Sequence, residues 1–318
     1  MAIRLTDDRF ESAFRGDLIR PGDDDYDDAR AVWNGMIDRR PALIARCTGV
    51  ADVIEAVTLA SEAGCPASVR GGGHNVSGSA VCDGGLVIDC SEMTAVGVDP
   101  AARTVRVQAG ARWADVDHET GAFGLATPGG VVSDTGVAGL TLGGGIGHLR
   151  RKHGLSCDNL RLAEVVTADG EFVTASATRH ADLFWALRGG GGVGVVTAFE
   201  FDCHPVGPEV ATCFAFYPGD EATDCLRAYR EFTATAPDEV STLTSTGVMY
   251  DPDLFQADVV DETKFAVMGC YAGDPEAGER ALAPLRALAD PIAEYSAVRQ
   301  YVDFQRILDE DYPEGRRY

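Results

Sequence analysis

The stretch "CPASVRGGGHNVSGSAVCDGG", residues 65–85, contains the feature on which the fold prediction rests. Three consecutive glycines, 71–73, lie between Arg70 and His74, directly after the short strand-like run "ASV". Glycine adopts positive φ and has no Cβ, so a glycine run after a strand lets backbone N–H groups approach an anionic ligand. A single run of this kind is more often only a turn, so the rest of the chain decides between the two interpretations.

Two further glycine clusters follow, "GVAGLTLGGGIG" at 136–147 and "RGGGGVGVV" at 188–196. Three clusters close together in the chain indicate one large anionic ligand that is held by backbone groups. No cluster is followed by the lysine of a P-loop, and 136–147 lacks the preceding strand and the later acidic residue of a classical dinucleotide fold. We therefore expect a different nucleotide-binding architecture.

Composition excludes several classes of protein. The chain has 318 residues, of which 45% are hydrophobic, which favours more than one domain. The net charge of −23 disfavours a nucleic-acid partner, and the basic run "LRRKHG" at 149–154 is too short to compensate. Lysine occurs only at Lys152 and Lys264. An acidic proteome adapted to salt and an arginine-biased genome both explain this scarcity, and the sequence leaves both open.

Location and metal content are predicted from what the sequence lacks. No apolar run is long enough to span a bilayer and the charged N-terminal residues do not resemble a signal peptide, so we expect a cytoplasmic protein without a membrane partner. The nine cysteines show no zinc-site spacing, so we expect free, mostly buried thiols and no metal.

The pattern of elements predicts two domains. Short strands and helices alternate from residue 41 to about 205, with a helix over 50–64 and a tight hairpin at Asp169-Gly170. The run "HPVGPE" at 204–209 interrupts the pattern and predicts a boundary there. Beyond it, the order strand, helix, strand, strand, helix predicts an antiparallel sheet with flanking helices.

The motifs "PASVRGGGHNVSG", "LATPGGVVSDTGVAGLTLGGGIG", "KHGLSCDNL", "VTADGEFVTASA", "DLFWALRGGGG" and "GVVTAFEF" occur in this order along the chain. Together they resemble the FAD-linked oxidases of the vanillyl-alcohol oxidase/p-cresol methylhydroxylase (PCMH-type) superfamily, in its berberine-bridge-like and 6-hydroxynicotine-oxidase-like branch. The resemblance covers residues 10–317. It implies an α+β fold, with a PCMH-type FAD-binding domain over 1–205 and a substrate domain over 206–318.

The resemblance also implies the cofactor site. The loop 69–75 would wrap the FAD diphosphate, and His74 would bond covalently to the 8α-methyl of the flavin, since a neutral imidazole is a competent nucleophile. The alternative for His74 is a hydrogen-bonded structural histidine. Val132 stands where some relatives have a second linking cysteine, so a single link is expected. The implied FAD contacts are Val69, Arg70, Gly71, Gly72, Gly73, His74, Asn75, Thr135, Gly136, Gly139, Leu140 and Val196.

The sequence departs from the family pattern at several places. Gly192 and Val193 stand where close relatives usually have an asparagine and an aromatic residue. His148 stands where an aromatic residue is common, and two roles are open for it: a base in the substrate pocket or a histidine on the surface. The chain ends at "DYPEGRRY", where the family continues into a segment that covers the flavin and often carries the catalytic base. We therefore name no catalytic residue. We expect a substrate domain that is truncated at its C-terminus and a chain that binds FAD weakly or is partly aggregated. Alone it should turn over little or no substrate, and a second chain is a candidate partner that supplies the missing region.

The function that the resemblance implies is oxidation of a small organic substrate, an alcohol, an amine or a sugar. Hydride would pass to flavin N5 and then to dioxygen. The alternatives are a non-catalytic or split flavin-binding fragment and, with less support, a nicotinamide-dependent dehydrogenase.

Overall fold

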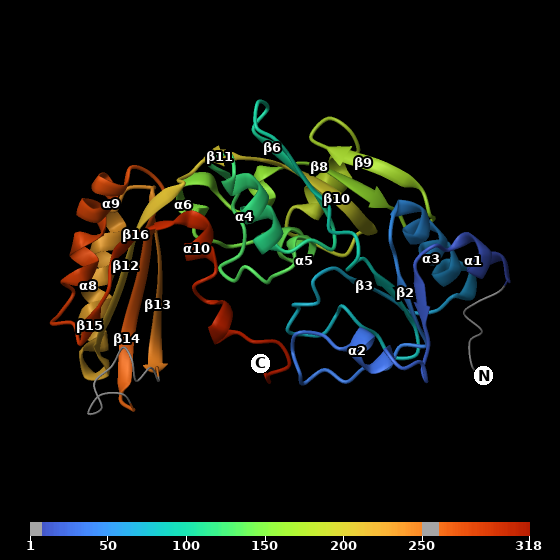
Figure 1. The fold of residues 1–318 in the computed structure, drawn as a ribbon, viewed down its shortest axis with the longest axis horizontal. Helices are drawn as coiled ribbons and strands as arrows, with labels where there is room; N and C mark the ends of the chain where they lie inside the picture. The colour runs from blue at the N-terminus through green and yellow to red at the C-terminus, as the bar shows by residue number, and fades with distance from the viewer. Residues whose placement is uncertain (1–7, 250–260) are drawn as a thin grey trace.

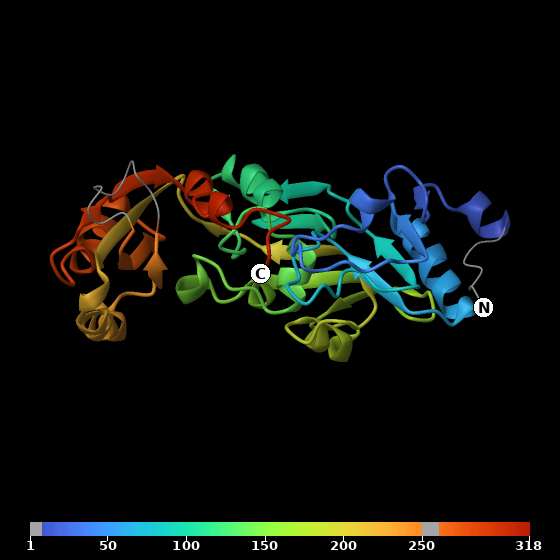
Figure 2. The same cartoon turned by 90° about the horizontal axis from the view of Figure 1, so that it is seen from below.

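The computed structural model describes residues 8–249 and 261–318. Within these residues, three larger sheets follow one another along the long axis of the molecule, as Figure 1 shows. Figure 2 shows the same row of sheets from below. The N-terminal elements form one end of the row and the sheet built after residue 208 forms the other.

The first sheet has the order β1 (Asp17–Ile19), β2 (Leu43–Arg46), β4 (Leu86–Asp89), β3 (Ala67–Arg70). Strands β2, β4 and β3 run parallel, and β1 is antiparallel to β2. Helix α3 (Val50–Ala63) connects β2 to β3 and ends at Gly64, whose φ of 58° is left-handed, as the sequence predicts. The α3 connection therefore places the end of β3, and the glycine loop after it, at the carboxyl edge of a parallel sheet.

The central sheet is antiparallel, in the order β5 (Val96–Asp99), β6 (Thr104–Gln108), β10 (Val195–Asp202), β8 (Leu160–Val166), β9 (Phe172–Ser176). Strands β8 and β9 pair across a turn in which Gly170 has a φ of 82°, so the predicted hairpin at Asp169-Gly170 is confirmed. Phe199 and Phe201 of β10 are fully buried in the core of this region. Helices α4 (Trp113–Gly121), α5 (Val137–Leu142), α6 (Arg150–His153) and α7 (Ala181–Leu187) lie in its connections.

The third sheet is also antiparallel, in the order β13 (Val240–Val248), β14 (Thr263–Tyr271), β12 (Glu209–Pro218), β15 (Ala293–Glu294), and β16 (Ala297–Gln300) pairs with β12 as well. Helices α8 (Ala222–Thr235) and α9 (Pro275–Leu282) cover its outer face (Figure 1). The predicted order of strands and helices after residue 208 is confirmed.

Short elements complete the fold. They are α1 (Asp8–Ala13), α2 (Tyr26–Arg30), the pair β7 (Leu125–Ala126) and β11 (His204–Pro205), α10 (Tyr301–Gln305), and the 3-10 turns Ser156–Asn159, Gly219–Glu221, Ala283–Arg286 and Asp309–Asp311. Seven of the nine cysteines are buried, the other two are partly exposed, and none forms a disulfide. Within the described residues, no helix has the length and apolarity that crossing a membrane requires.

The basic run at 149–154 connects the central region to the third sheet. Helix α6 presents three successive cations to backbone carbonyl groups of that sheet: Arg150 Nη2 donates to Thr242, Arg151 Nη1 to Val240, and Lys152 Nζ to Ala272 at 2.8 Å. The run therefore fixes the position of the third sheet by hydrogen bonds from charged donors, which are stronger than neutral ones.

Candidate cofactor site

Two of the glycine clusters cross at the carboxyl end of β3. A Cβ at Gly72 would lie 2.5 Å from the Cα of Gly136, and a Cβ at Gly71 would lie 2.8 Å from the carbonyl oxygen of Ala109. Gly73 has a left-handed φ of 71°. The two loops can approach this closely only because these positions have no side chain, which is the physical reason for glycine here.

A cavity of about 270 Å³ lies against the crossing. It is lined by Val69, Gly71, Gly72, Gly73, His74, Asn75, Ser79, Ala80, Thr135, Gly136, Gly139 and Leu140. Apart from Arg70 and Val196, every residue that the sequence assigned to FAD is in this set. Ser79 and Ala80 were missed, because the short run "GSA" carries no recognisable nucleotide-binding pattern.

Arg70 and Val196 lie elsewhere. The Arg70 guanidinium donates from Nη1 to the carbonyl of Ala29 at 2.6 Å, so it supports the loop from behind. Val196 is a buried residue of β10 that is paired with Val165 of β8. Neither residue lines the cavity, so their assignment to the cofactor stays a prediction without support from this geometry.

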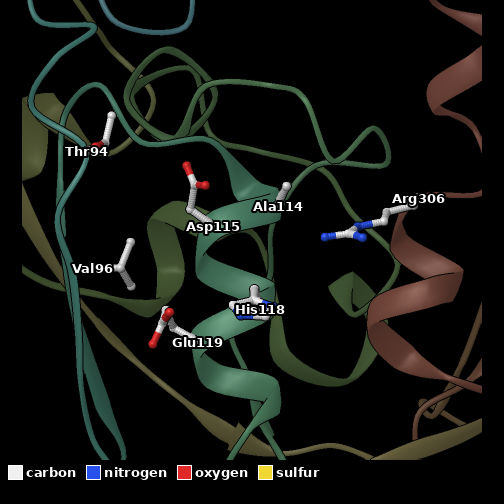
Figure 3. A pocket seen from close by; sticks show the side chains of 7 residues that line it. All are labelled: Thr94, Val96, Ala114, Asp115, His118, Glu119 and Arg306. Carbon is white, nitrogen blue, oxygen red and sulfur yellow. The ribbon is translucent and has the colours of Figure 1, made fainter.

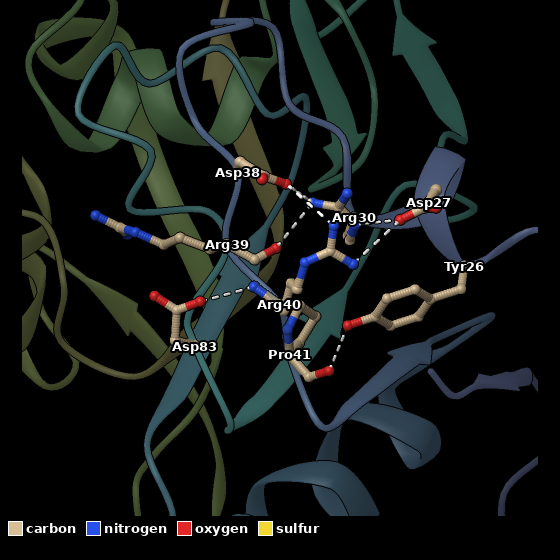
Figure 4. Close-up of polar contacts among 8 residues, drawn as sticks. All are labelled: Tyr26, Asp27, Arg30, Asp38, Arg39, Arg40, Pro41 and Asp83. Atoms are coloured by element: carbon tan, nitrogen blue, oxygen red, sulfur yellow. Dashed lines mark hydrogen bonds and ion pairs between the residues drawn. The ribbon is translucent and has the colours of Figure 1, made fainter. Parts of the chain in front are cut away.

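Arg39 also holds the segment that follows the glycine loop. Arg39 Nη1 donates to the carbonyls of Gly78 and Val81, at 2.7 and 2.8 Å. Figure 4 shows a neighbouring polar cluster, in which Arg30 lies between Asp27 and Asp38 and the Arg39 side chain points away. The contacts drawn there join α2 to the segment that precedes β2. Further polar contacts of this cluster are Tyr26 Oη to the Pro41 carbonyl, Arg30 to the Arg39 carbonyl, Arg40 N to Asp83, and the ion pairs of Arg40 with Asp27 and Asp38.

His74 lies at the end of the glycine loop in a mostly enclosed position. Its Nε2 is 3.3 Å from Oδ2 of Asp134, and its ring stacks on Trp33 with centroids 5.0 Å apart and planes 20° apart. Trp33 in turn stacks with Tyr318 at 3.7 Å. Burial, together with the nearby charge of Arg112, lowers the pKa of His74 to about 4. The imidazole is therefore neutral at neutral pH.

The sequence did not single out Trp33, Asp134 or Arg112. Arg112 forms an ion pair with Asp134, and the backbone N–H of Trp33 donates to the carbonyl of Gly73 at 3.2 Å. These residues come from three separate loops, so no local pattern in the sequence connects them to His74.

His148 is buried, with 3% of its surface exposed, and packs on Phe304 of α10 with ring centroids 4.5 Å apart. The alternative of a surface histidine is therefore wrong, because Phe304 of α10 packs on the ring. Burial lowers the pKa of His148 to about 3. Such an imidazole is a weak base, and His148 does not line the cavity at the glycine crossing.

A second cavity, of about 290 Å³, lies between α4 and α10 (Figure 3). The Arg306 side chain points toward α4 across it, and Asp115, His118 and Glu119 are exposed to solvent on α4. Asp115 accepts a hydrogen bond from the backbone of Arg112, so it serves as a cap of the helix. This cavity contains none of the glycine-loop residues.

Several known proteins are similar to this chain in sequence and in fold. The family described as "FAD binding domain" matches residues 41–176. The (R)-6-hydroxynicotine oxidase of Paenarthrobacter nicotinovorans is 33% identical over 293 residues, which is 91% of this chain and 62% of that protein. The crystal structure of 6-hydroxy-D-nicotine oxidase from Arthrobacter nicotinovorans superimposes with a TM-score of 0.86 at 30% identity, over 99% of this chain and 67% of that one. Physcomitrella patens BBE-like 1 gives 0.84 at 26% identity, over 96% and 64%.

The chain therefore belongs to the PCMH-type family of FAD-linked oxidases, with 6-hydroxynicotine oxidase and the berberine-bridge-like oxidases among its relatives. The resemblance and the fold class predicted from the sequence are confirmed. The chain spans 66% and 62% of the lengths of two curated relatives that it matches. Membership of this family supports FAD as the cofactor and disfavours the nicotinamide alternative.

Proposed function

We propose that this protein is an oxidase that binds FAD in the cavity at the glycine crossing, with His74 as its single covalent link. In this proposal residues 1–205 form the FAD-binding domain and 206–318 the substrate domain. The observation that carries it is the gathering of two glycine loops and a neutral histidine around one cavity.

The residues at the cavity fit a flavin dinucleotide. No charged side chain lines it, so the negative charges of a diphosphate would be met by backbone N–H groups of the glycine loops. Gly71, Gly72 and Gly136 expose the backbone at positions where a Cβ would collide with the backbone of a facing segment. A cavity of about 270 Å³ would hold only part of a dinucleotide, and the remainder would extend along the loops. When bound, FAD supplies a hydride acceptor that delivers electrons to dioxygen.

The substrate side of the proposal rests on the inner face of the third sheet. Phe214 of β12 stacks with Tyr295 at 5.3 Å, and Arg299 places its guanidinium carbon 5.8 Å from each of these two rings. In Figure 1 this face is directed toward the middle of the molecule, away from α8 and α9. Phe214 is 7% exposed and Tyr295 is 39% exposed, so Tyr295 offers the accessible ring of this group. That ring would orient a small organic substrate, an alcohol, an amine or a sugar, by packing.

The test begins with the purified chain. A flavin spectrum that remains with the protein after acid precipitation is expected, and His74→Ala should release that flavin while non-covalent binding through the glycine loops persists. His118→Ala, which removes an exposed histidine, is the matched control. Denatured His74→Ala that still carried flavin would overturn the link, and a protein that binds no flavin at all would overturn the proposal.

Peroxide formation across a panel of alcohols, amines and sugars tests turnover. Flavin reduction by at least one class, followed by peroxide, would support the oxidase. A protein that keeps its flavin but shows neither reaction would instead be a flavin-binding fragment without turnover, the alternative that the sequence raised.

A further inference from the structure

Asp134 is the only carboxylate that contacts His74 among the described residues. It lies in the loop that leads into α5, with 41% of its side chain exposed, and its other oxygen pairs with Arg112. The residue before it is fixed as well, since Ser133 donates from its backbone N and its Oγ to Asp309, at 2.8 and 2.6 Å. Asp134 therefore reaches His74 from a loop that is held in place.

The contact determines which nitrogen of His74 carries the proton. A neutral imidazole has one N–H, and an ionised carboxylate only accepts hydrogen bonds. The nitrogen that faces Asp134 is Nε2, so Nε2 is the donor and Nδ1 keeps its lone pair. Among the described residues, the hydrogen bond of the His74 ring is made through Nε2 and none is made through Nδ1. Trp33 covers the face of the ring and limits its rotation.

We propose that Asp134 is a positioning residue for flavin attachment, which holds His74 as the Nε2–H tautomer and so makes Nδ1 the nitrogen that bonds to the flavin. The inference rests on the proposed function, in which His74 carries the link. In other enzymes a neighbouring carboxylate fixes which ring nitrogen of a histidine carries the proton. When that carboxylate is replaced by an amide, the site keeps its geometry but the proton moves to the nitrogen that has to react.

Attachment would form one bond between Nδ1 of His74 and the 8α carbon, and would break one C–H bond of the methyl group and the Nε2–H bond. Dioxygen would take up the two electrons and the two released protons as hydrogen peroxide. Asp134 lies at the atom from which the imidazole proton leaves, and its partly exposed carboxylate can pass that proton to water.

The test compares Asp134→Asn with one control variant. An asparagine can donate to Nε2 as well as accept from it, so the tautomer is no longer fixed. The control is Glu119→Gln, which removes a carboxylate from the exposed side of α4. The rate of covalent incorporation, followed by acid-stable flavin after addition of FAD to full-length chain made without flavin, should fall at least about tenfold in Asp134→Asn only.

The second readout does not depend on flavin. Nitrogen NMR of the same flavin-free chain with labelled histidine shows which ring nitrogen of His74 is protonated. Nε2 is expected in the wild type and in the Glu119→Gln control, and a mixture in Asp134→Asn. Protonation at Nδ1 in the wild type, or unchanged attachment and tautomer in Asp134→Asn, would overturn the role of Asp134. A wild type that never attaches flavin but shows the Nε2–H form would refute the link at His74 and leave the tautomer assignment standing.

Discussion

Asp117 of α4 links the stability of this protein to pH. Its side chain is 2% exposed, its Oδ2 accepts a hydrogen bond from Gln305 Nε2 of α10 at 3.1 Å, and its Oδ1 has no hydrogen-bond partner in the described part of the chain. Burial raises the pKa of Asp117 from 3.8 to about 7. The native protein therefore holds a proton on this carboxyl group that the unfolded chain releases from about pH 4 upward.

The sign of the effect follows from linkage. Since the native state binds more protons between pH 3.8 and 7, the free energy of unfolding falls as pH rises through this window. At 1.36 kcal/mol per pKa unit, the ionised carboxyl group lowers the free energy of unfolding at pH 8 by about 4 kcal/mol, compared with a group that stays neutral. Asp117→Asn keeps an oxygen acceptor for Gln305 and carries no charge. It should match the wild type near pH 4 and exceed it by up to about 4 kcal/mol at pH 8.

The assay is urea unfolding of both proteins at pH 4, 6 and 8, with Glu119→Gln as a carboxylate control on the exposed side of the same helix. Because other titrating groups are common to both proteins, they cancel in the difference. A difference between Asp117→Asn and the wild type that is constant from pH 4 to pH 8 would refute the assignment of a shifted proton to Asp117.

Three other substitutions test the packing around the site. Gly72→Ala places a Cβ 2.5 Å from Gly136, so the loops must separate, and flavin bound per chain should fall to a small fraction while Gly97→Ala, at an open position, leaves it unchanged. Phe304→Ala opens a cavity beneath His148 and should lower the free energy of unfolding by 3–5 kcal/mol, about the cost of truncating a buried aromatic side chain, as measured by urea unfolding. Arg151→Ala removes donors to backbone carbonyls of the third sheet and should speed proteolysis near residue 205; an unchanged cleavage rate would show that α6 does not fix this sheet.

Much of the local chemistry of this protein can be predicted from its sequence. Glycine at 71–73 and 136, the turn at Asp169-Gly170 and the helix stop at Gly64 are requirements of backbone conformation, so each is visible within a few residues. The order of the motifs then identified the family, because a series of local requirements in fixed order is highly specific. The residues that face the cavity, except Ser79 and Ala80, were predicted for the same reason, since they belong to the motifs themselves.

The surroundings of His74 and the contacts that hold the third sheet depend instead on how distant segments pack together. Trp33 and Asp134 reach His74 from loops far apart in the chain, and their neighbours in the sequence carry no pattern that marks them. The burial of His148 and Asp117 depends on α10, which packs onto both from the far end of the sequence. A pKa responds to the total burial and charge around a group. It is therefore decided by packing between distant segments, which a local motif does not encode.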